Sequence, residues 1–198
     1  MANRDPALTP PTLVLASASP RRRELLARLG LPFTVRPAGL EETLAPGRSP
    51  AEQAEHLARA KAQAVWRETG GWVVAADTVV ALEDAVLGKP RTPEENRAFL
   101  ERLSGRAHTV YTGLALYTPG GEGRSLVEAA RVWFRDLEPW EVDWYVRSGE
   151  GMDKAGGYGI QEKGMVLVRR VEGDFYTVVG LPVHRLWTLL KEVGYPLA

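Results

Sequence analysis

Several ionisable residues in this chain stand where folding alone does not account for them, and Asp77 is the sharpest case. It interrupts an apolar run, Val73-Val-Ala-Ala-Asp77-Thr78-Val-Val80, whose members are expected to be buried. A buried carboxylate without a partner is costly, so it shifts its pKa or acquires a cation. At the carboxyl end of a strand, Asp77 could bind a divalent metal ion or accept a proton from water. The alternative is a structural role, in which Asp77 caps a helix or accepts hydrogen bonds from backbone amides.

A second candidate site is the turn Ser17-Ala-Ser19-Pro20-Arg21-Arg22, which joins an apolar segment to a helical pattern. Ser19 suits the N-cap and Pro20 the first helical position. Three other predicted helices that start with proline carry Glu at the third helical position, as a capping box requires, whereas this one carries Arg22. Backbone N–H groups, serine hydroxyls and guanidinium groups that converge at a helix start suit a polyphosphate. The alternative is an exposed basic helix end with solvated arginines.

Further carboxylates and lysines could complete such a site. Glu41 and Glu42 form an acidic pair in a predicted loop, and paired carboxylates suit Mg²⁺ or Mn²⁺, although a solvated loop pair is equally common. Lys61 lies among small residues of a helical pattern, where it could turn inward or face solvent. Lys89, in Gly88-Lys89-Pro90, could contact phosphate if its loop faces Asp77, and is otherwise a surface lysine.

The segment from Asp153 to Gln161 combines charges, a glycine-rich turn, an aromatic ring and an amide. Gln161 could bind the edge of a nucleobase because its amide offers both a donor and an acceptor, with support from Tyr158. The alternative is a loop in which the amide of Gln161 is satisfied internally.

Hydrophobic periodicity and turn residues predict the elements that position these side chains. Strands and helices alternate, which predicts a three-layer α/β domain with a partly parallel sheet. Residues 1–11 carry three prolines without periodicity, so we expect a flexible N-terminal tail followed by a single domain over 12–198. The predicted strands are 12–16, 33–40, 72–82, 108–117, 126–134 and 165–171, and the predicted helices are 20–29, 50–68, 93–103, 139–147 and 181–193.

Composition excludes several classes of function. The 198 residues have a formal net charge of +0 and no cysteine, which excludes disulfides, thiol nucleophiles and thiolate zinc sites. Basic residues form a local cluster without interleaved aromatic residues, so a nucleic-acid partner is not expected. No segment approaches the roughly 18 apolar residues of a membrane span, and no signal-peptide core is present at the N-terminus. We therefore expect a cytoplasmic enzyme with no membrane partner.

Taken together, these motifs resemble the Maf family of nucleoside triphosphate pyrophosphatases, in order and spacing, over nearly the whole chain. The matching segments are Ala16-Ser-Ala-Ser-Pro-Arg-Arg22, Glu41-Glu42, Ala60-Lys61-Ala62, Ala76-Asp77-Thr78-Val79-Val80, Leu87-Gly88-Lys89-Pro90, Leu103-Ser104-Gly105, Asp153-Lys154-Ala155-Gly156 through Gln161, and Val179-Gly180-Leu181-Pro182.

The resemblance implies metal-dependent hydrolysis of a nucleoside triphosphate between its α and β phosphates. It assigns Asp77 as the proton acceptor, with Glu42, Lys61 and Lys89 as supporting catalytic residues. Glu42 and Asp77 are the implied ligands of Mg²⁺ or Mn²⁺. The resemblance also implies an inosine-triphosphatase-like fold, with a curved mixed sheet and a cleft between two lobes, and a possible homodimer.

Substrate preference is likewise implied by the resemblance. Ser17, Arg21 and Arg22 match the phosphate-binding turn, and Arg21, Thr78 and Gln161 together resemble the branch that prefers dTTP and UTP. After Gln161 the family usually carries glycine, whereas this chain has Glu162-Lys163. A house-cleaning pyrophosphatase for dTTP, UTP or modified pyrimidine nucleotides is therefore expected. The alternatives are a pyrophosphatase for modified purine triphosphates such as 7-methyl-GTP, and a non-catalytic nucleotide-binding regulator of cell division.

Overall fold

A seven-stranded mixed sheet forms the centre of the computed structural model, which describes residues 9–197. The strands follow the order β2-β1-β3-β5-β6-β7, and β4 pairs with β3 outside this path. β1 runs parallel to β2 and β3, whereas the other neighbouring pairs are antiparallel. The strands are β1 (Leu13–Leu15), β2 (Phe33–Val35), β3 (Trp72–Leu82), β4 (Ala85–Leu87), β5 (Ala107–Tyr117), β6 (Gly123–Phe134) and β7 (Val168–Glu172).

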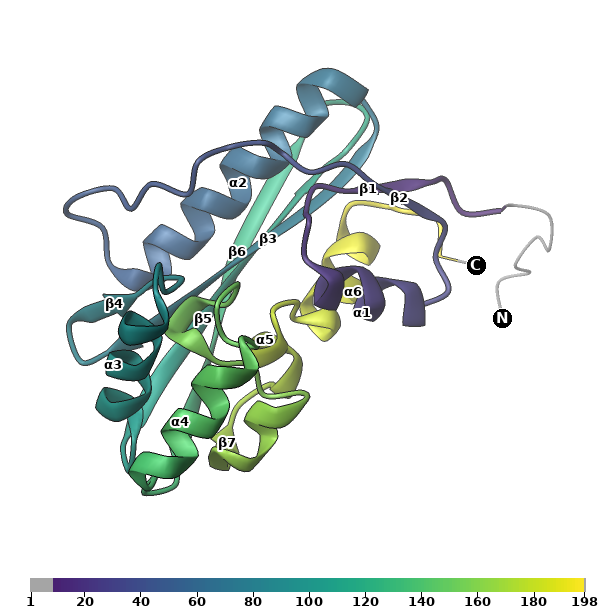
Figure 1. Cartoon of the computed structure of the whole chain (residues 1–198). Coiled ribbons are helices and arrows are strands. Elements are labelled where there is room, and N and C mark those ends of the chain that lie inside the picture. The colour runs from purple at the N-terminus through teal and green to yellow at the C-terminus, as the bar shows by residue number, and fades with distance from the viewer. Residues whose placement is uncertain (1–8, 198) are drawn as a thin grey trace.

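Helices cover both faces of this sheet (Figure 1). On one face α2 packs across β3, β5 and β6, and on the other face α1 and α6 contribute to a hydrophobic core with β1 and β3. The helices are α1 (Pro20–Arg28), α2 (Pro50–Thr69), α3 (Pro93–Leu103), α4 (Pro139–Ser148), α5 (Phe175–Val179) and α6 (Val183–Glu192), with 3-10 turns η1 (Ala155–Gly157) and η2 (Lys163–Val166). This arrangement confirms the predicted layered α/β architecture with a mixed sheet.

Capping residues account for the helix starts, as the sequence predicts. In α2 the Ser49 hydroxyl accepts from the backbone N–H of Glu52, and the Glu52 carboxylate accepts from the N–H of Ser49, which completes a capping box. In α3 the Thr92 hydroxyl accepts from the N–H of Glu95. Both helices begin at the proline that follows the cap, because that residue has no N–H to leave unsatisfied.

Other elements differ from the prediction. The predicted strand 33–40 ends at Val35, since Pro37 has no N–H to donate to a neighbouring strand. The predicted strand 165–171 is partly the 3-10 turn η2, and β7 begins only at Val168. The short elements β4 and α5 were not predicted at all, and both flank the site described below.

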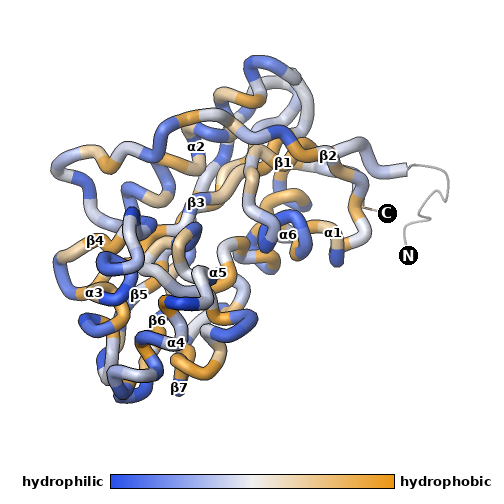
Figure 2. Tube along the Cα trace, viewed as in Figure 1, coloured by the Kyte–Doolittle hydropathy of each residue, from blue (hydrophilic) through white to orange (hydrophobic). Residues whose placement is uncertain are grey.

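Side chains of β3 alternate between the two faces of the sheet. Val73 and Ala75 belong to the core beneath α2, whereas Val74 belongs to the core beneath α1 and α6. Figure 2 shows both hydrophobic and hydrophilic residues along α1 and α6, as expected of helices that bury one side. The alternation carries Asp77 to the face covered by α2 and Thr78 to the opposite face.

One edge of β3 is unpaired near its middle. β5 pairs with the opposite edge from Val73 to Ala81, so β1 and β4 share the remaining edge. β1 pairs only as far as Val74, and β4 pairs only from Val80. Among the described strands none pairs with residues 75–79 on this side. Side chains from both faces of the sheet can therefore meet in the gap between β1 and β4.

The two ends of the described chain lie close together. The Tyr195 hydroxyl donates a hydrogen bond to the backbone carbonyl of Pro11, which ties the segment before β1 to the C-terminal segment. Most of the predicted tail over 1–11 falls on residues 1–8, which lie outside the described residues. None of the helices described in the structure combines the length and the apolar character that a membrane span requires.

Candidate active site

A cavity of about 420 Å³ opens beside the unpaired edge of β3. Its walls come from the turn after β1, the loop before α2, α2 itself, β3, the loop after β4 and the glycine-rich segment after α4. Nine of the residues predicted to form a site line this one cavity. They are Ser17, Arg21, Arg22, Glu42, Lys61, Asp77, Thr78, Lys89 and Gln161.

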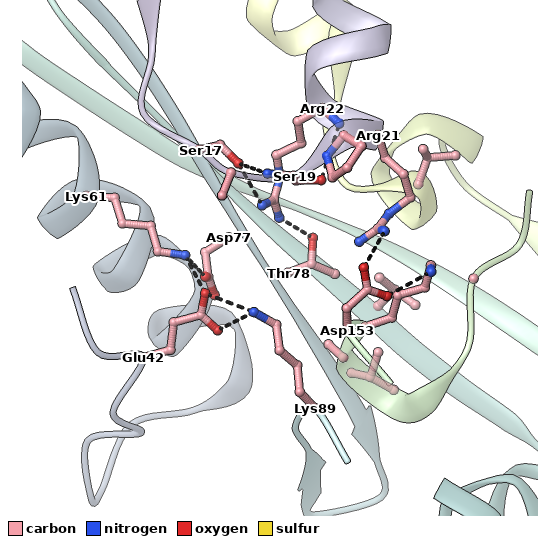
Figure 3. Close-up of a pocket in the computed structure, with 18 of the residues that line it drawn as sticks. Ser17, Ser19, Arg21, Arg22, Glu42, Lys61, Asp77, Thr78, Lys89 and Asp153 are labelled. Carbon is pink, nitrogen blue, oxygen red and sulfur yellow. Dashed lines mark hydrogen bonds and ion pairs between the residues drawn. The ribbon is translucent and has the colours of Figure 1, made fainter. Parts of the chain in front are cut away.

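Lys61 links two carboxylates in this cavity (Figure 3). Its Nζ donates to Asp77 Oδ1 at 2.7 Å and to Glu42 Oε1 at 2.8 Å. Lys89 approaches Glu42 from another direction, with its Nζ 3.2 Å from Oε2. The side chains of Asp77 and Lys61 are only 6% and 11% exposed, whereas that of Lys89 is 52% exposed. The Asp77–Lys61 ion pair is therefore buried, and the Glu42–Lys89 pair faces solvent.

Small residues bring α2 close enough to the sheet for Lys61 to reach Asp77. Gly113 lies opposite Asp77 in the β3–β5 ladder, and a Cβ at this position would lie 2.2 Å from the carbonyl oxygen of Ala54. One helical turn further along, Ala58 is fully buried against the sheet. Lys61 therefore turns inward, as one of the two predicted alternatives for this lysine requires.

The two carboxylates differ in their affinity for protons. Burial raises the pKa of the Asp77 carboxyl, and the positive charges of Lys61 and Arg22 only partly oppose this effect. Burial acts in the same direction on Glu42, but the hydrogen bond and charge of Lys61, helped by Lys89, lower the pKa of Glu42 overall. Asp77 is consequently the better proton acceptor of the two.

At the start of α1, Ser17 takes the place of the glutamate that completes a capping box. The Ser19 hydroxyl accepts from the N–H of Arg22 at 3.4 Å, which confirms Ser19 as the N-cap. The N–H of Ser19, which a glutamate at the third helical position would bind, donates instead to the Ser17 hydroxyl at 3.1 Å. The third position is thereby free to carry Arg22, whose side chain extends into the cavity.

The two arginines of this turn have different surroundings. Arg22 donates through Nε to the carbonyl oxygen of Gly180 at 2.7 Å and through Nη2 to Thr78 Oγ1 at 3.0 Å. Arg21 extends across the cavity, with its Nη1 3.9 Å from Asp153 Oδ2. Arg22 therefore also fastens the turn to the segment between α5 and α6, and only its remaining N–H groups can bind a phosphate.

Gln161 lies in a loop whose two ends are held together. The Tyr145 hydroxyl accepts from the N–H of Gly159 at 3.0 Å and donates to the carboxylate of Glu150, also at 3.0 Å. The same carboxylate accepts at 3.0 Å from the N–H groups of Gly164 and of the residue before it. Glu150 thus closes the loop that presents Gln161 to the cavity. The pair Glu162-Lys163, which replaces the glycine usual after Gln161, lies within this closed loop.

Three details of the sequence prediction are wrong. Asp77 stands in the middle of β3 and not at its carboxyl end, and it borders the cavity because β1 stops short of it. Glu41 does not line the cavity, although Glu42 does. The Tyr158 hydroxyl lies 2.6 Å from His108 Nε2 in the hydrophobic core, so Tyr158 supports the cavity wall and not the Gln161 amide.

Three residues next to the site were not indicated by the sequence. Tyr145 and Glu150 hold the loop of Gln161, and Thr112 contacts Thr78 from β5. Glu150 offered one weak signal, a charged residue directly after the helix-ending Gly149 and before the glycine-rich segment. A threonine inside a strand, such as Thr112, carries no signal of a role at a site.

Two carboxylates of the cavity match the ligands that a divalent metal ion uses in proteins. Among residues 9–197 no group of three or more His, Asp or Glu side chains could hold a metal ion by itself. Glu42 and Asp77 nevertheless converge on one cation, the Nζ of Lys61. Mg²⁺ is commonly held by one or two carboxylates together with water and substrate phosphates, and these two carboxylates match that pattern.

Fold and site together define an α/β protein with one cavity lined by two carboxylates and several cationic side chains, and the fold has a solved counterpart. The Ham1 protein of Staphylococcus aureus superposes with a TM-score of 0.52 at 15% sequence identity, covering 92% of this chain and 100% of that chain. At this identity the similarity shows the fold alone, and it confirms the inosine-triphosphatase-like architecture predicted from the sequence.

Sequence comparison identifies the family. The model of the family described as "Maf-like protein" matches residues 12–193, and the chain belongs to this family. A dTTP/UTP pyrophosphatase of Thermus thermophilus is 56% identical over 185 residues, covering 93% of this chain and 96% of the relative. Proteins of the same name from Myxococcus xanthus and Deinococcus radiodurans are 53% and 50% identical; the matches cover 93% and 96% of this chain and 94% and 96% of the respective relatives.

Proposed function

We propose that this chain is a nucleoside triphosphate pyrophosphatase that converts dTTP and UTP to the monophosphate and pyrophosphate. The observation that carries the proposal is a single cavity in which the buried Asp77–Lys61 pair and the turn of Arg21 and Arg22 both take part. The relatives named dTTP/UTP pyrophosphatase support it. A house-cleaning role, which removes modified pyrimidine nucleotides as well, is part of the same proposal.

Asp77 is the proposed general base. Its Oδ1 is held by Lys61, whereas Oδ2 makes no hydrogen bond with any residue of the described chain. The raised pKa suits Asp77 to take a proton from water. In the proposed step, a water proton passes to Asp77 as the water oxygen bonds to the α phosphorus. The bond from the α phosphorus to the bridging oxygen then breaks, and pyrophosphate leaves with its electron pair.

Cationic side chains are proposed to stabilise the charge that develops on the phosphate oxygens. Lys61 contacts the proposed base, Lys89 contacts Glu42, and Arg21 and Arg22 lie at the proposed phosphate-binding turn with Ser17. Fixed cations in a partly enclosed cavity stabilise such charge without covalent chemistry. The bases of dTTP and UTP are proposed to contact Thr78 and Gln161, which line the same cavity.

A divalent cation, Mg²⁺ or Mn²⁺, is proposed as the cofactor. Glu42 and Asp77 would hold it together with phosphate oxygens of the substrate. When bound, such an ion lowers the pKa of coordinated water and offsets phosphate charge. Lys61 contacts both carboxylates and so fixes their relative orientation before the substrate arrives.

A substrate screen with and without Mg²⁺ tests the proposal. Pyrophosphate release is measured for dTTP, UTP, CTP, GTP and 7-methyl-GTP. We expect metal-dependent release of pyrophosphate, fastest with dTTP and UTP. Fastest release with 7-methyl-GTP would favour the modified-purine alternative. Binding of nucleotides without any pyrophosphate release would favour the non-catalytic regulator.

A cytoplasmic location and a homodimer complete the proposal. The homodimer rests on the family resemblance of the sequence, whereas the cytoplasmic location is the expectation drawn from its composition. Sedimentation of the purified protein measures the oligomeric state, with a dimer as the expected result.

A further inference from the structure

Thr78 belongs to a chain of hydrogen bonds that runs from Arg22 in the cavity to the backbone of Thr177 in the core. Its Oγ1 accepts from Nη2 of Arg22 at 3.0 Å and lies 2.9 Å from Oγ1 of Thr112. The Thr112 hydroxyl donates at 2.8 Å to the backbone carbonyl oxygen of Thr177, in α5. Thr112 and Thr177 are fully buried, so water does not compete for these bonds.

The two ends of this chain determine the direction of every proton in it. A guanidinium group can only donate, and a carbonyl oxygen can only accept. The single hydroxyl proton of Thr112 is used on the carbonyl of Thr177, so Thr112 must accept from Thr78. The proton of Thr78 is therefore committed to Thr112. What Thr78 Oγ1 retains, after accepting from Arg22, is one lone pair.

Because its proton is already used, the Thr78 hydroxyl can only accept a hydrogen bond from a bound nucleotide. Phosphate oxygens are acceptors, so a hydroxyl with no proton to offer gains nothing from contact with them. A nucleobase ring N–H is a donor and suits the remaining lone pair. Uracil and thymine carry a proton on N3, whereas N3 of cytosine is unprotonated and would direct its own lone pair at that of Thr78.

We propose that Thr112 is a specificity-determining positioning residue, which orients the hydroxyl of Thr78 so that the site selects pyrimidines with a protonated N3. The inference rests on the proposed function and deepens it. Thr112 does not touch the substrate, and acts only by accepting the proton of Thr78. A site that can only accept a hydrogen bond strongly rejects an analogue that presents a second acceptor at the same place, because neither acceptor then receives a hydrogen bond.

The test compares UTP with CTP, which are the same size and differ at N3 and C4 of the base. The kcat/KM ratio and the Kd ratio of the two nucleotides are measured in the wild type, in Thr112→Val and in Thr112→Ser. Without the Thr112 hydroxyl, Thr78 is free to rotate and donate to cytosine N3. We expect Thr112→Val to lower the UTP/CTP ratio of kcat/KM by about tenfold or more, mainly through changes in KM. Thr112→Ser keeps the hydroxyl and is expected to keep the ratio.

Other outcomes separate a failure of this inference from a failure of the proposed function. A wild type that binds UTP and CTP but hydrolyses neither contradicts the proposed function, and the Kd ratio still tests Thr112. Equal losses for both nucleotides in Thr112→Val, with a lower melting temperature, indicate a structural role and overturn the inference. A wild type without preference for UTP also overturns it. If Thr112→Val does not fold, Thr112→Cys provides the same comparison, because a thiol is a weak hydrogen-bonding group.

Discussion

Replacement of Lys61 by methionine probes the buried pair at the bottom of the cavity. Methionine keeps most of the apolar stem of lysine but removes the ammonium that lies 2.7 Å from Asp77 and 2.8 Å from Glu42. A cation in direct contact lowers the pKa of a carboxyl by about 1–3 units. Without Lys61, burial and the neighbouring negative charge of Glu42 act on Asp77, with only Arg22 to oppose them. The pKa of Asp77 therefore rises further.

Loss of Lys61 is expected to move the pH dependence of activity to higher pH. The proposed base works only when Asp77 is ionised, so kcat/KM falls as the pH drops through the pKa of Asp77. We expect the acid limb of the pH–rate profile for UTP to move upward by about 1–3 pH units in Lys61→Met. The free energy of unfolding should fall by about 3–5 kcal/mol at neutral pH, because Asp77 is left buried and unpaired. Below the raised pKa this loss shrinks, since a protonated Asp77 carries no charge.

Lys89→Met is the matched control. Lys89 contacts Glu42 but is not among the charges that act on Asp77, and its side chain is half exposed. Its replacement is expected to slow turnover without moving the acid limb. An acid limb that stays in place in Lys61→Met, or moves equally in both variants, would show that the pair does not control the proposed base.

Three further predictions concern the core and the Gln161 loop. Burial lowers the pKa of His108 to about 4, so unfolded chains bind a proton below pH 6.5 while the native state does not. Urea titrations should show about 3 kcal/mol of stability lost between pH 6.5 and 4, and His108→Gln should lack this loss. Gly113→Ala should lose at least about 1–3 kcal/mol in thermal melts, because its Cβ meets the Ala54 carbonyl, whereas Gly120→Ala, with room for a methyl group, should not. Glu150→Gln should raise KM for UTP several-fold with kcat almost unchanged; a fall in kcat alone would argue against a positioning role.

The central strand and the helix starts could be predicted because their signals are local. The Val-rich run over 72–82 predicts β3 with the bounds that the structure has. Ser49 and Thr92, each followed by proline, mark the starts of α2 and α3 through bonds made within one turn. Such features depend on neighbouring residues, which a single sequence displays in full.

The missed elements lacked the usual signals. β4 returns from β3 through Glu83-Asp84, and Glu83 adopts a positive φ of 55° that glycine or asparagine more often occupies. α5 has the sequence Phe175-Tyr-Thr-Val-Val179, whose β-branched and aromatic residues favour a strand. Its capping residue, Asp174, is the one local sign of a helix.

Residue types identified the candidates for the site, but contacts between distant segments determine what each one does. The sequence could not show that β1 stops at Leu15 and so leaves Asp77 beside an open edge of the sheet. Nor could it show that Arg22 is shared between the cavity and Gly180, or that Thr112 lies against Thr78. The Arg22–Gly180 contact joins residues 158 apart in the sequence, and the Thr112–Thr78 contact joins residues 34 apart. No local pattern predicts strand register or loop closure over such separations.

The most direct test of the account is a single-turnover measurement on Asp77→Asn with UTP and Mg²⁺, in which nucleotide binding and pyrophosphate release are followed in the same experiment. Asparagine keeps the shape of the side chain but cannot accept the proton of the attacking water. We expect UTP to bind, since the arginine turn is intact, and pyrophosphate release to slow by at least about 10²-fold. Release within a few-fold of the wild-type rate would contradict the role of Asp77, and loss of UTP binding in a folded variant would contradict the division of the cavity into a base and a separate phosphate-binding turn.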